Sequence, residues 1–278
     1  GNWIVREIEA PTGFVLSEKI YPVTVDADGA VIEVEIENIR IRGTVQLTKI
    51  DRDYPDNKLT GAEFTVYRDS NGNKELDADD ELVGTLTETG IGVYEMADLF
   101  YGGYFVKETK APDGFYLDGN AYYFGITEDG KTVTVENEAG KGFVNAPQVG
   151  SLKIIKTSSD GKIEGFSFRV TGPNGYVGVF TTDKNGEIII DDLRIGEYVV
   201  SEVSDGASSA YVLPADKTAS VFEGAVTKVE MHNELRDTPK TGDDSNPALW
   251  LALLGISAAG AAALGVAGFR KRRKKGTE

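Results

Sequence analysis

The chain has 278 residues, 33 of them glycine and none of them cysteine, and its formal net charge at pH 7 is −16. The length allows two or three small domains, and the lack of cysteine excludes disulfide staples and a thiol nucleophile. The acidic charge argues against a nucleic-acid partner, because phosphate binding needs Lys and Arg, which gather here at the extreme C-terminus. The single histidine, His232, excludes a His-based metal cluster and argues against a Ser-His-Asp triad, and we expect no cofactor.

Residues 1–42 have the pattern of the second half of a β-rich unit. They contain a strand-like run with a glutamate, WIVREIEAPTGF around Glu7, and a later run with an asparagine, VEIENI around Asn38. Gly1 enters the first run directly, without the basic start and apolar stretch of a secretory signal peptide. We therefore expect the first half of this unit, and the N-terminus of the protein, to lie outside this sequence.

Two complete copies of the pattern follow, in residues 43–148 and 149–236. The first copy opens with GTVQLTKID, continues through YFVKET and ends on GFVNAP, whereas the second uses GSLKIIKTS, YVVSEV and VEMHNE. Short apolar runs are separated by Gly, Asn and Asp turns, and no long 3.6-residue period interrupts them. This pattern predicts an all-β fold of tandem Ig-like β-sandwiches.

A polar stretch inside the first complete copy alternates oxygen-bearing side chains. The spacing resembles that of an EF-hand calcium loop, although the mid-loop glycine and the flanking helices are missing. A solvated acidic hairpin loop is the interpretation we favour, so we predict no metal site and keep calcium as the weaker alternative. The residues concerned are Asp69, Asn71, Asn73, Asp77 and Asp80.

Alternation along the strands places polar residues on the inward face of each copy. Lys49, for example, has the same parity as Val45 and Leu47, and successive strand side chains point to opposite faces of a sheet. His232 falls on the outer face. The inward polar residues are Lys49, Glu108 and Asn145 in the first copy, Lys156, Glu202 and Asn233 in the second, and Glu7 and Asn38 in the partial unit.

A buried amine beside a buried carboxyl group has unusual protonation. Desolvation lowers the pKa of Lys and raises the pKa of Glu, so proton transfer can leave a neutral amine next to a neutral acid. A neutral amine is a nucleophile, and a protonated Glu can polarise the Asn carboxamide and shuttle protons. The amine can then expel ammonia and form an amide. The alternative is a hydrogen-bonded triad without a covalent bond.

The pattern resembles the Cna protein B-type domains, also called SpaA-like or prealbumin-like, of Gram-positive pilins and adhesins. Its most specific mark is VKETKAPDGF around Glu108, which resembles the pilin E-box and is echoed by VREIEAPTGF around Glu7. The resemblance covers nearly all of residues 1–236. It implies a prealbumin-like fold and intramolecular Lys-Asn isopeptide bonds that form under an acidic catalyst.

By position, the resemblance assigns two bonds to the complete copies. The second copy has SDGASSAYVL after its glutamate where the others have APxGF, so its bond matches the family less closely. The partial unit matches in Glu7 and Asn38, and its Lys is expected in the preceding segment. The implied bonds are Lys49 to Asn145 with Glu108 as catalyst, and Lys156 to Asn233 with Glu202 as catalyst.

The C-terminal region has the features of a membrane-spanning signal. Residues 248–269 are apolar apart from one Ser, which suits a hydrocarbon core of about 30 Å. The run RKRRKK follows at once, and the positive-inside rule keeps such a cluster in the cytoplasm. We therefore expect a transmembrane helix over 248–269, a basic cytoplasmic tail over 270–278, and the rest of the chain outside the cell.

A short motif with a spacer, residues 237–247, precedes the apolar segment. The order Pro-x-Thr-Gly, apolar helix and basic tail resembles the LPXTG sorting signal that sortase transpeptidases recognise, although Thr stands here in place of Leu. The resemblance implies a secreted protein that sortase cuts between Thr241 and Gly242 and joins through Thr241 to peptidoglycan, after transient residence in the membrane. The alternative is a plain single-span membrane protein. The motif consists of Thr238, Pro239, Lys240, Thr241 and Gly242.

These features predict a wall-anchored stalk of a Gram-positive surface adhesin or minor-pilin-like protein, without turnover of an external substrate. Two other functions stay open. The chain could be the anchoring region of a surface enzyme whose catalytic domain lies outside this sequence. Alternatively, the repeats themselves could bind a host or matrix ligand. In the stalk interpretation, such a ligand would bind the expected N-terminal region.

Overall fold

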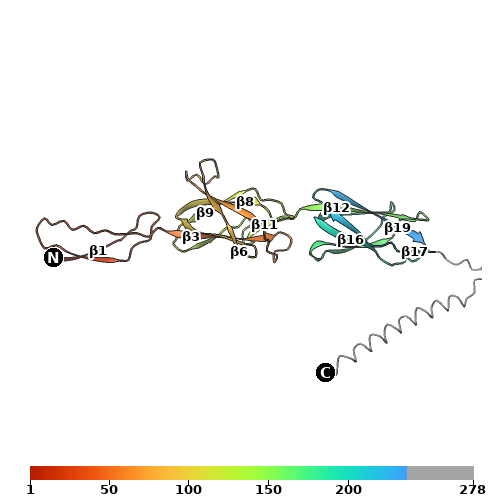
Figure 1. Ribbon diagram of the computed structural model, residues 1–278, viewed down its shortest axis with the longest axis horizontal. Helices are drawn as coiled ribbons and strands as arrows, with labels where there is room; N and C mark the ends of the chain where they lie inside the picture. The colour runs from red at the N-terminus through yellow and green to blue at the C-terminus, as the bar shows by residue number, and fades with distance from the viewer. Residues whose placement is uncertain (237–278) are drawn as a thin grey trace, which may run out of the picture.

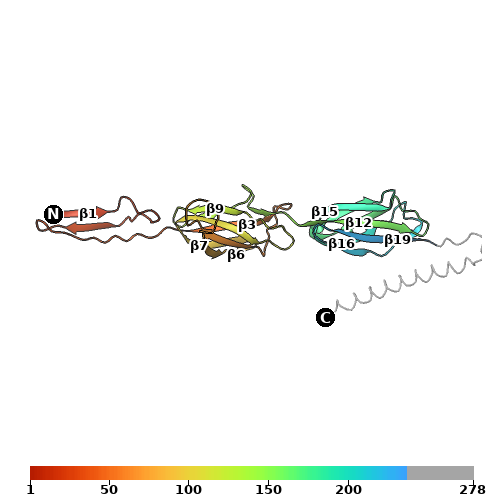
Figure 2. The same cartoon turned by 90° about the horizontal axis from the view of Figure 1, so that it is seen from above.

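The computed structural model describes residues 1–236, so the predicted sorting motif, apolar segment and basic tail lie outside the described residues. Within 1–236 the chain forms strands and one short 3-10 helix, η1 (Pro173–Gly175). In this part of the chain no helix is long and apolar enough to span a bilayer. The all-β prediction is confirmed for these residues. An N-terminal hairpin unit and two β-sandwiches follow one another along the long axis (Figures 1 and 2).

The N-terminal hairpin unit, residues 1–40, contains β1 (Asn2–Arg6) and β2 (Ile20–Thr24), which pair antiparallel. Its apolar side chains are largely uncovered, and Trp3 is 65% exposed. The strand predicted around Asn38 does not form, and that prediction was wrong. Residues 33–38 keep the predicted alternation of exposed and half-buried positions. They form no ladder because no described strand lies beside them, and a strand needs a hydrogen-bonded neighbour.

The first sandwich consists of two facing sheets built from β3 to β11. The strands of one sheet are β10 (Thr132–Thr134), β3 (Arg42–Asp51), β7 (Val93–Phe100) and β6 (Thr87–Gly90), with β11 (Phe143–Asn145) parallel to β3. The strands of the other sheet are β5 (Glu81–Thr85), β4 (Glu63–Arg68), β8 (Gly102–Lys110) and β9 (Ala121–Ile126). The first strand of this sandwich therefore lies beside its last.

The second sandwich repeats this arrangement with β12 to β19. The strands of one sheet are β15 (Glu187–Arg194), β12 (Val149–Ser158), β19 (Val226–Leu235) and β17 (Tyr211–Val212). The strands of the other sheet are β14 (Val177–Thr181), β13 (Ser167–Thr171), β16 (Gly196–Glu202) and β18 (Lys217–Val221). The first and last strands, β12 and β19, again pair in parallel.

Each sandwich has its own hydrophobic core between its sheets. The positions predicted to face inward on β3 are fully buried, and the alternate positions are only half-buried. In the second sandwich, Leu152, Ile154 and Met231 are fully buried as well, whereas His232 lies on the outer face, as predicted. The alternation of side chains in the sequence therefore identifies the face of each of these strands that packs into the core.

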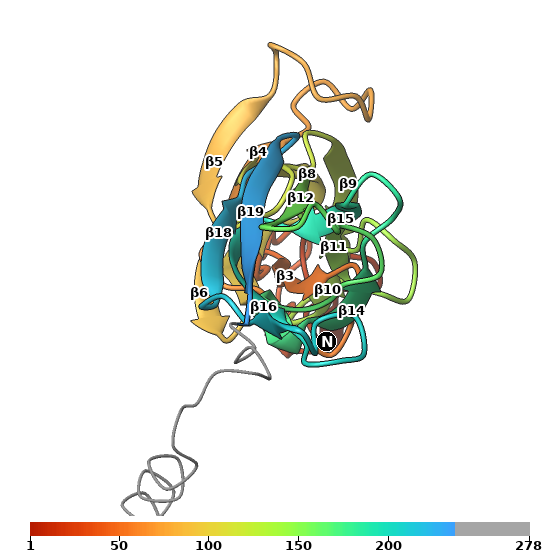
Figure 3. The same ribbon diagram turned by 90° about the vertical axis from the view of Figure 1, so that its right-hand side faces the viewer.

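The acidic stretch predicted to form a hairpin loop connects β4 and β5 and projects from the first sandwich (Figure 3). Its carboxylates accept backbone N–H groups of the loop: Asp69 from Gly72 and Asp80 from Ser70. Lys74 stands where an EF-hand loop would have its mid-loop glycine, and it takes the left-handed backbone, with a φ of 62°. Within residues 1–236, no three His, Cys, Asp or Glu side chains gather in a way that could hold a metal ion.

Candidate cross-linking sites

The Lys and the Asn of each sandwich lie on neighbouring parallel strands with the same offset. On β3 and β11, Lys49 is opposite Phe143, and Asn145 is opposite Asp51. Residues two apart on a strand share a face, so Lys49 and Asn145 both point inward. The second sandwich repeats the geometry: Lys156 on β12 is opposite Met231 on β19, and Asn233 is opposite Ser158.

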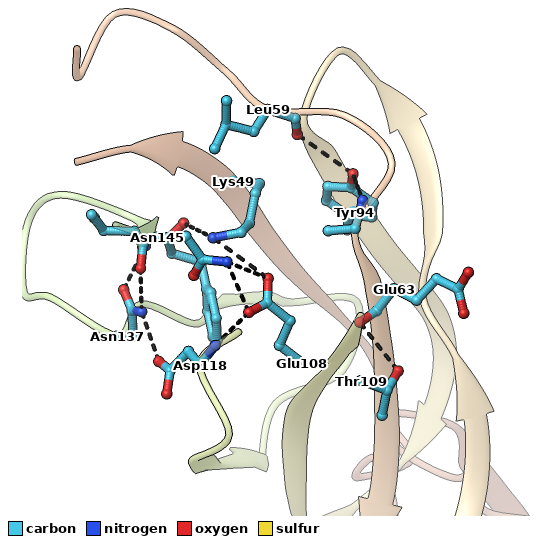
Figure 4. Close-up of polar contacts among 12 residues, drawn as sticks. Lys49, Leu59, Glu63, Tyr94, Glu108, Thr109, Asp118, Asn137 and Asn145 are labelled. Atoms are coloured by element: carbon cyan, nitrogen blue, oxygen red, sulfur yellow. Dashed lines mark hydrogen bonds and ion pairs between the residues drawn. The ribbon is translucent and has the colours of Figure 1, made fainter. Parts of the chain in front are cut away.

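Glu108 of the first sandwich reaches this pair from the facing sheet, on β8 (Figure 4). The amide nitrogen of Asn145 donates to both carboxylate oxygens of Glu108, at 2.8 and 2.9 Å. The Nζ of Lys49 lies 3.6 Å from Oε1 of Glu108 and donates to the carbonyl oxygen of Phe143 at 3.0 Å. Lys49 and Glu108 are both fully buried and Asn145 is 2% exposed, so the structure brings the three predicted residues together in a site closed to bulk solvent.

Burial changes the protonation of Lys49. Desolvation lowers the pKa of its amine to about 8, although the nearby Glu108 carboxylate acts in the opposite direction. The ring of Phe143 lies 5.2 Å from the Nζ and is part of the apolar surroundings that remove water from the amine. A neutral, nucleophilic form of Lys49 is therefore accessible near neutral pH, as the sequence analysis expected for a buried lysine.

A support network behind the site was missed by the sequence analysis. The side chain of Asn137 donates to Asp118 and to the carbonyl oxygen of Val144, both at 2.8 Å, and it accepts the N–H of Val144 at 2.6 Å. Asp118 in turn gives its own N–H to Glu108 at 2.7 Å. The network connects β11, which carries Asn145, to the loop whose residue Asp118 donates a hydrogen bond to Glu108. Asn137 and Asp118 lie outside the strands and belong to no periodic pattern, so only the folded structure shows that they contribute to the site.

The second sandwich assembles the corresponding residues less completely. The amide nitrogen of Asn233 donates to Oε1 of Glu202 at 2.6 Å, but Nζ of Lys156 donates to the carbonyl oxygen of Thr157 instead of contacting the carboxylate. Lys156 is 1% exposed, Asn233 is fully buried and Glu202 is 9% exposed. Desolvation lowers the pKa of Lys156 and raises the pKa of Glu202, and in each case the opposite charge of the partner reduces the shift.

Glu202 lacks a donor that the other two glutamates have. The backbone N–H of the residue ten positions later donates at 2.7 Å to the carboxylate in each of the other units: Asp118 to Glu108 and Ser17 to Glu7. Within residues 1–236, Oε2 of Glu202 has no hydrogen-bond partner. The segment after Glu202 is the one whose sequence departs from APxGF. A missing donor leaves the neutral, protonated form of a buried carboxyl group favoured.

The N-terminal hairpin unit keeps the remaining pair. The amide nitrogen of Asn38 donates to Glu7 at 2.7 Å and to the carbonyl oxygen of Val15 at 3.1 Å. Both residues are only half-buried, in contrast to their fully buried equivalents in the first sandwich. The unit thus presents the acid and the amide of a site, as the sequence analysis expected, without a lysine beside them among the described residues.

The comparisons with known proteins agree with this arrangement. The profile of the SpaA prealbumin-like fold domain matches residues 1–40, 43–140 and 150–235. The chain belongs to the SpaA prealbumin-like domain family. One matched segment lies in each of the hairpin unit and the two sandwiches, so each is a SpaA-like unit; the match in the first sandwich ends before β11. No curated protein matches the chain.

The Bacillus anthracis TIE protein is a solved structure with the same fold. The SpaA-like units superpose on the Bacillus anthracis TIE protein with a TM-score of 0.65 and 26% identity, over 84% of this chain and 41% of that one. The chain therefore spans less than half of that protein. A weaker match is the minor pilin GBS52 of Streptococcus agalactiae, with a TM-score of 0.33 and 17% identity over 72% of this chain and 99% of that one. Another is a C-terminal fragment of the pilus adhesin SpaC of Lactobacillus rhamnosus GG, with a TM-score of 0.43 and 16% identity over 71% of this chain and 98% of that one.

Proposed function

We propose that this chain is the structural stalk of a sortase-anchored surface adhesin or minor-pilin-like protein, strengthened by intramolecular isopeptide bonds. The observation that carries the proposal is the buried Lys-Glu-Asn set of each sandwich, in which the Lys and the Asn lie on the first and last strands with the same offset and the Glu comes from the facing sheet. Membership of the SpaA prealbumin-like family supports a surface, pilin-like role. The proposed bonds are Lys49 to Asn145 and Lys156 to Asn233.

The proposed reaction is an aminolysis of the Asn carboxamide. The neutral Nζ of Lys49 attacks Cγ of Asn145, a new C–N bond forms, and the former amide nitrogen leaves as ammonia. Glu108 carries the proton from the attacking amine to the leaving group. The Oδ1 atoms of Asn145 and Asn233 have no hydrogen-bond partner within residues 1–236. When the carboxamide rotates by half a turn, a protonated Glu can donate to this oxygen and stabilise the oxyanion that develops there.

A bond at this place would alter how the stalk carries load. Because β3 and β11 are the first and last strands of the first sandwich, force entering along β3 would cross from Lys49 to Asn145 and leave toward β12. The residues between them would then bear little of the pulling force. In the unfolded chain, such a link would also restrict a loop on the order of 100 residues, which is worth about 4–5 kcal/mol if disulfide-like chain entropy applies.

We further propose that the motif from Thr238 to Gly242 attaches the stalk to the cell wall. Sortase would cut after Thr241 and transfer its carboxyl group to an amine of the peptidoglycan precursor. This part of the proposal rests on the motif, apolar segment and basic tail of the sequence. It is tested by incubating the chain with a sortase and an amine nucleophile: Thr241→Ala should abolish the adduct and Thr227→Ala should keep it, whereas no adduct with the native chain would refute the proposal.

The decisive experiment for the cross-links is the intact mass of the chain. We expect the native chain to lack the mass of two ammonia molecules, and Glu108→Ala and Glu202→Ala each to lack one. Two exposed glutamates provide matched controls: Glu63→Ala on β4 and Glu197→Ala on β16 should retain both losses. An unmodified mass for the native chain would refute the covalent mechanism.

A further inference from the structure

The turns after the glutamate strands of the hairpin unit and of the first sandwich take no part in the cross-linking chemistry, yet each lies where its unit meets the next. In the first sandwich, the N–H of Phe115 donates to the carbonyl oxygen of Pro112 at 3.1 Å, and Gly114 between them has a φ of 83°. A positive φ at the third position defines a type II turn, for which glycine is the favoured residue. We call this segment, residues 111–115, and its equivalent 10–14 the APxGF turns.

Two backbone hydrogen bonds connect this turn to the second sandwich. The linker residue Gln148 gives its N–H to the carbonyl oxygen of Gly114 at 2.8 Å, and it accepts the N–H of Ile195 at 3.1 Å. Gly114 also faces Ile195 directly, since a Cβ at Gly114 would lie 3.7 Å from a side-chain carbon of Ile195. The linker is thus tied to both sandwiches at what we call the second joint.

The first joint, between the hairpin unit and the first sandwich, repeats these bonds. The linker residue Ile41 donates to the carbonyl oxygen of Gly13 at 2.9 Å and accepts the N–H of Tyr101 at 3.1 Å. Gly13 has a φ of 84°, and a Cβ there would lie 3.4 Å from the side chain of Tyr101. We call this pair of backbone hydrogen bonds, from the linker to the glycine and from the next unit to the linker, the backbone relay. It occurs at both joints although the linker residues and the contacting side chains differ, which indicates that it is a property of the fold.

The described chain ends with a unit that closes its turn without glycine. In the second sandwich, Tyr211 donates to the carbonyl oxygen of Ser208 at 3.0 Å, and Arg236 donates to that of Ala210 at 2.9 Å. Ala210, at the position of Gly114, is not among the residues with positive φ. Within residues 1–236, the left-handed glycine of this turn thus occurs in the two turns that contact a following unit.

A charged contact across the second joint supplements the relay. The guanidinium of Arg194 makes two hydrogen bonds to Asp51, both at 2.7 Å, and one to Asp53 at 2.9 Å. It also lies 4.7 Å from the ring centre of Tyr54 and 5.7 Å from that of Phe115. Asp51 is 2% exposed and the Arg194 side chain 15%, so the ion pair is shielded from water. Bidentate Arg-carboxylate pairs of this kind fix orientation as well as distance.

The first joint has an aromatic residue where the second has Arg194. Phe100 occupies the equivalent position, since Tyr104 donates to its carbonyl oxygen as Tyr198 does to that of Arg194. Two cations lie over the ring of Phe100: the guanidinium of Arg40, the last residue of the hairpin unit, is 5.3 Å from the ring centre, and that of Arg42 on β3 is 4.5 Å from it. Both joints therefore combine the relay with a cation over an aromatic ring, and the ion pair is a feature of the second joint.

We propose that the APxGF turn is a docking element for the next unit of the same chain, that it holds neighbouring units in one orientation, and that Arg194 locks the second joint. The sandwiches do not close on each other around this lock, because an open crevice of about 850 Å³ lies beside it, lined by residues of both. The orientation of the two sandwiches then depends on the backbone hydrogen bonds of the linker and on Arg194. The stalk is then a rod that resists bending, in line with the extended arrangement of its units (Figure 1).

The test measures the spread of orientations across the second joint in the full chain. Because the chain has no cysteine, two introduced cysteines take spin labels uniquely. Thr87→Cys on β6 and Val179→Cys on β14, both exposed, span the joint, whereas Val179→Cys with Glu230→Cys on β19 reports on the second sandwich alone. We expect pulsed dipolar spectroscopy to give a single distance peak across the joint, as narrow as that of the control pair.

Substitutions of Arg194 test its contribution to the second joint. Arg194→Ala should broaden the distance distribution across the joint at least twofold and leave that of the control pair unchanged. Arg194→Lys should give an intermediate width, because lysine keeps the positive charge but cannot make the two parallel hydrogen bonds of the guanidinium to Asp51. A broad distribution in the native chain would overturn the docking proposal. An unchanged width in Arg194→Ala would overturn the role of Arg194. The biological role of a stiff rod rests on the proposed stalk function, whereas the stiffness itself does not. The intact mass of the same samples tests the cross-links separately, so a failure of one proposal can be distinguished from a failure of the other.

Discussion

Lys49 and Asn145 lie on adjacent parallel strands, with Asn145 two residues beyond the position opposite Lys49. Lys156 and Asn233 have the same offset in the second sandwich. Because the first and last strands of a sandwich are neighbours here, one amide bond between them would close nearly the whole unit. The facing sheet supplies the acid in each case, so the two sheets must pack correctly before the chemistry can begin. The proposed reaction therefore depends on folding.

The protonation of Lys49 can be measured directly if the reaction is blocked. Asn145→Ala removes the electrophile but keeps the burial and the Glu108 charge that set the pKa of Lys49. We expect its amine to titrate with a pKa of about 8. About a tenth of the amine is then neutral at pH 7. NMR titration of lysine labelled with carbon-13 at Cε provides the measurement, with the resonance assigned from a Lys49→Arg variant. Titration at the ordinary value of 10.5 would contradict the proposed nucleophile.

The lowered pKa of Lys49 also predicts how the stability of Asn145→Ala depends on pH. The unfolded lysine keeps its ordinary pKa of 10.5, whereas the folded one has a pKa of about 8. Between these values the unfolded state binds more protons than the folded state, so the stability of Asn145→Ala should rise as the pH increases from about 8 to 10.5. Urea denaturation at several pH values would show this trend, and a flat or falling stability across this window would contradict it.

The support network predicts a variant that slows cross-linking without touching the triad. Asn137→Ala removes the hydrogen bonds that hold Val144 on β11, so Asn145 should be less well placed and the first cross-link should form at least tenfold more slowly. Asn120→Ala is the matched control, because Asn120 also donates to Asp118 but does not contact β11. Mass spectrometry of freshly synthesised chain at successive times follows the loss of ammonia. Equal rates for the two variants would show that the network is only structural.

The sequence predicts which lysine, glutamate and asparagine side chains point inward, but not the contacts that surround them. Parity along β3, β8, β12 and β16 identifies the inward lysines and glutamates because alternation is a local property of a strand. The network of Asn137 and Asp118 and the lock of Arg194 are contacts between loops or units, which no periodicity encodes. The wrong prediction around Asn38 has a related cause: a strand-like pattern needs a neighbouring strand to become a strand.

The two cross-links should form at different rates. Glu202 lacks the backbone donor that Asp118 gives to Glu108, and the amine of Lys156 is turned toward Thr157. The second site must therefore reorganise before the amine can attack. We expect the Lys156–Asn233 bond to appear later than the Lys49–Asn145 bond. Proteolysis of time-resolved samples followed by peptide mass spectrometry distinguishes the two linked peptides, and simultaneous appearance would contradict this order.

Loss of one cross-link should destabilise one sandwich only, since each has a separate core. Glu108→Gln keeps the shape of the acid but cannot shuttle a proton, so the first sandwich should lose about 4–5 kcal/mol of unfolding free energy. The second sandwich should be unaffected. Glu63→Gln, an exposed change on β4, is the control. Differential scanning calorimetry should show one transition moving to lower temperature. A shift of both transitions would show that the sandwiches unfold together.

Acid should loosen the second joint before it unfolds the sandwiches. Burial opposes ionisation of Asp53, but its hydrogen bonds to Arg52 and Arg194 outweigh this effect, so the pKa of Asp53 lies below its ordinary value of 3.8. A carboxyl group with a lowered folded-state pKa contributes stability above its ordinary pKa and loses it as the pH falls through the lowered value. The distance distribution across the joint should therefore broaden only when the pH falls to this lowered pKa, which lies below 3.8. The control pair within the second sandwich should stay narrow at the same pH, and broadening of both pairs together would indicate unfolding instead of release of the lock.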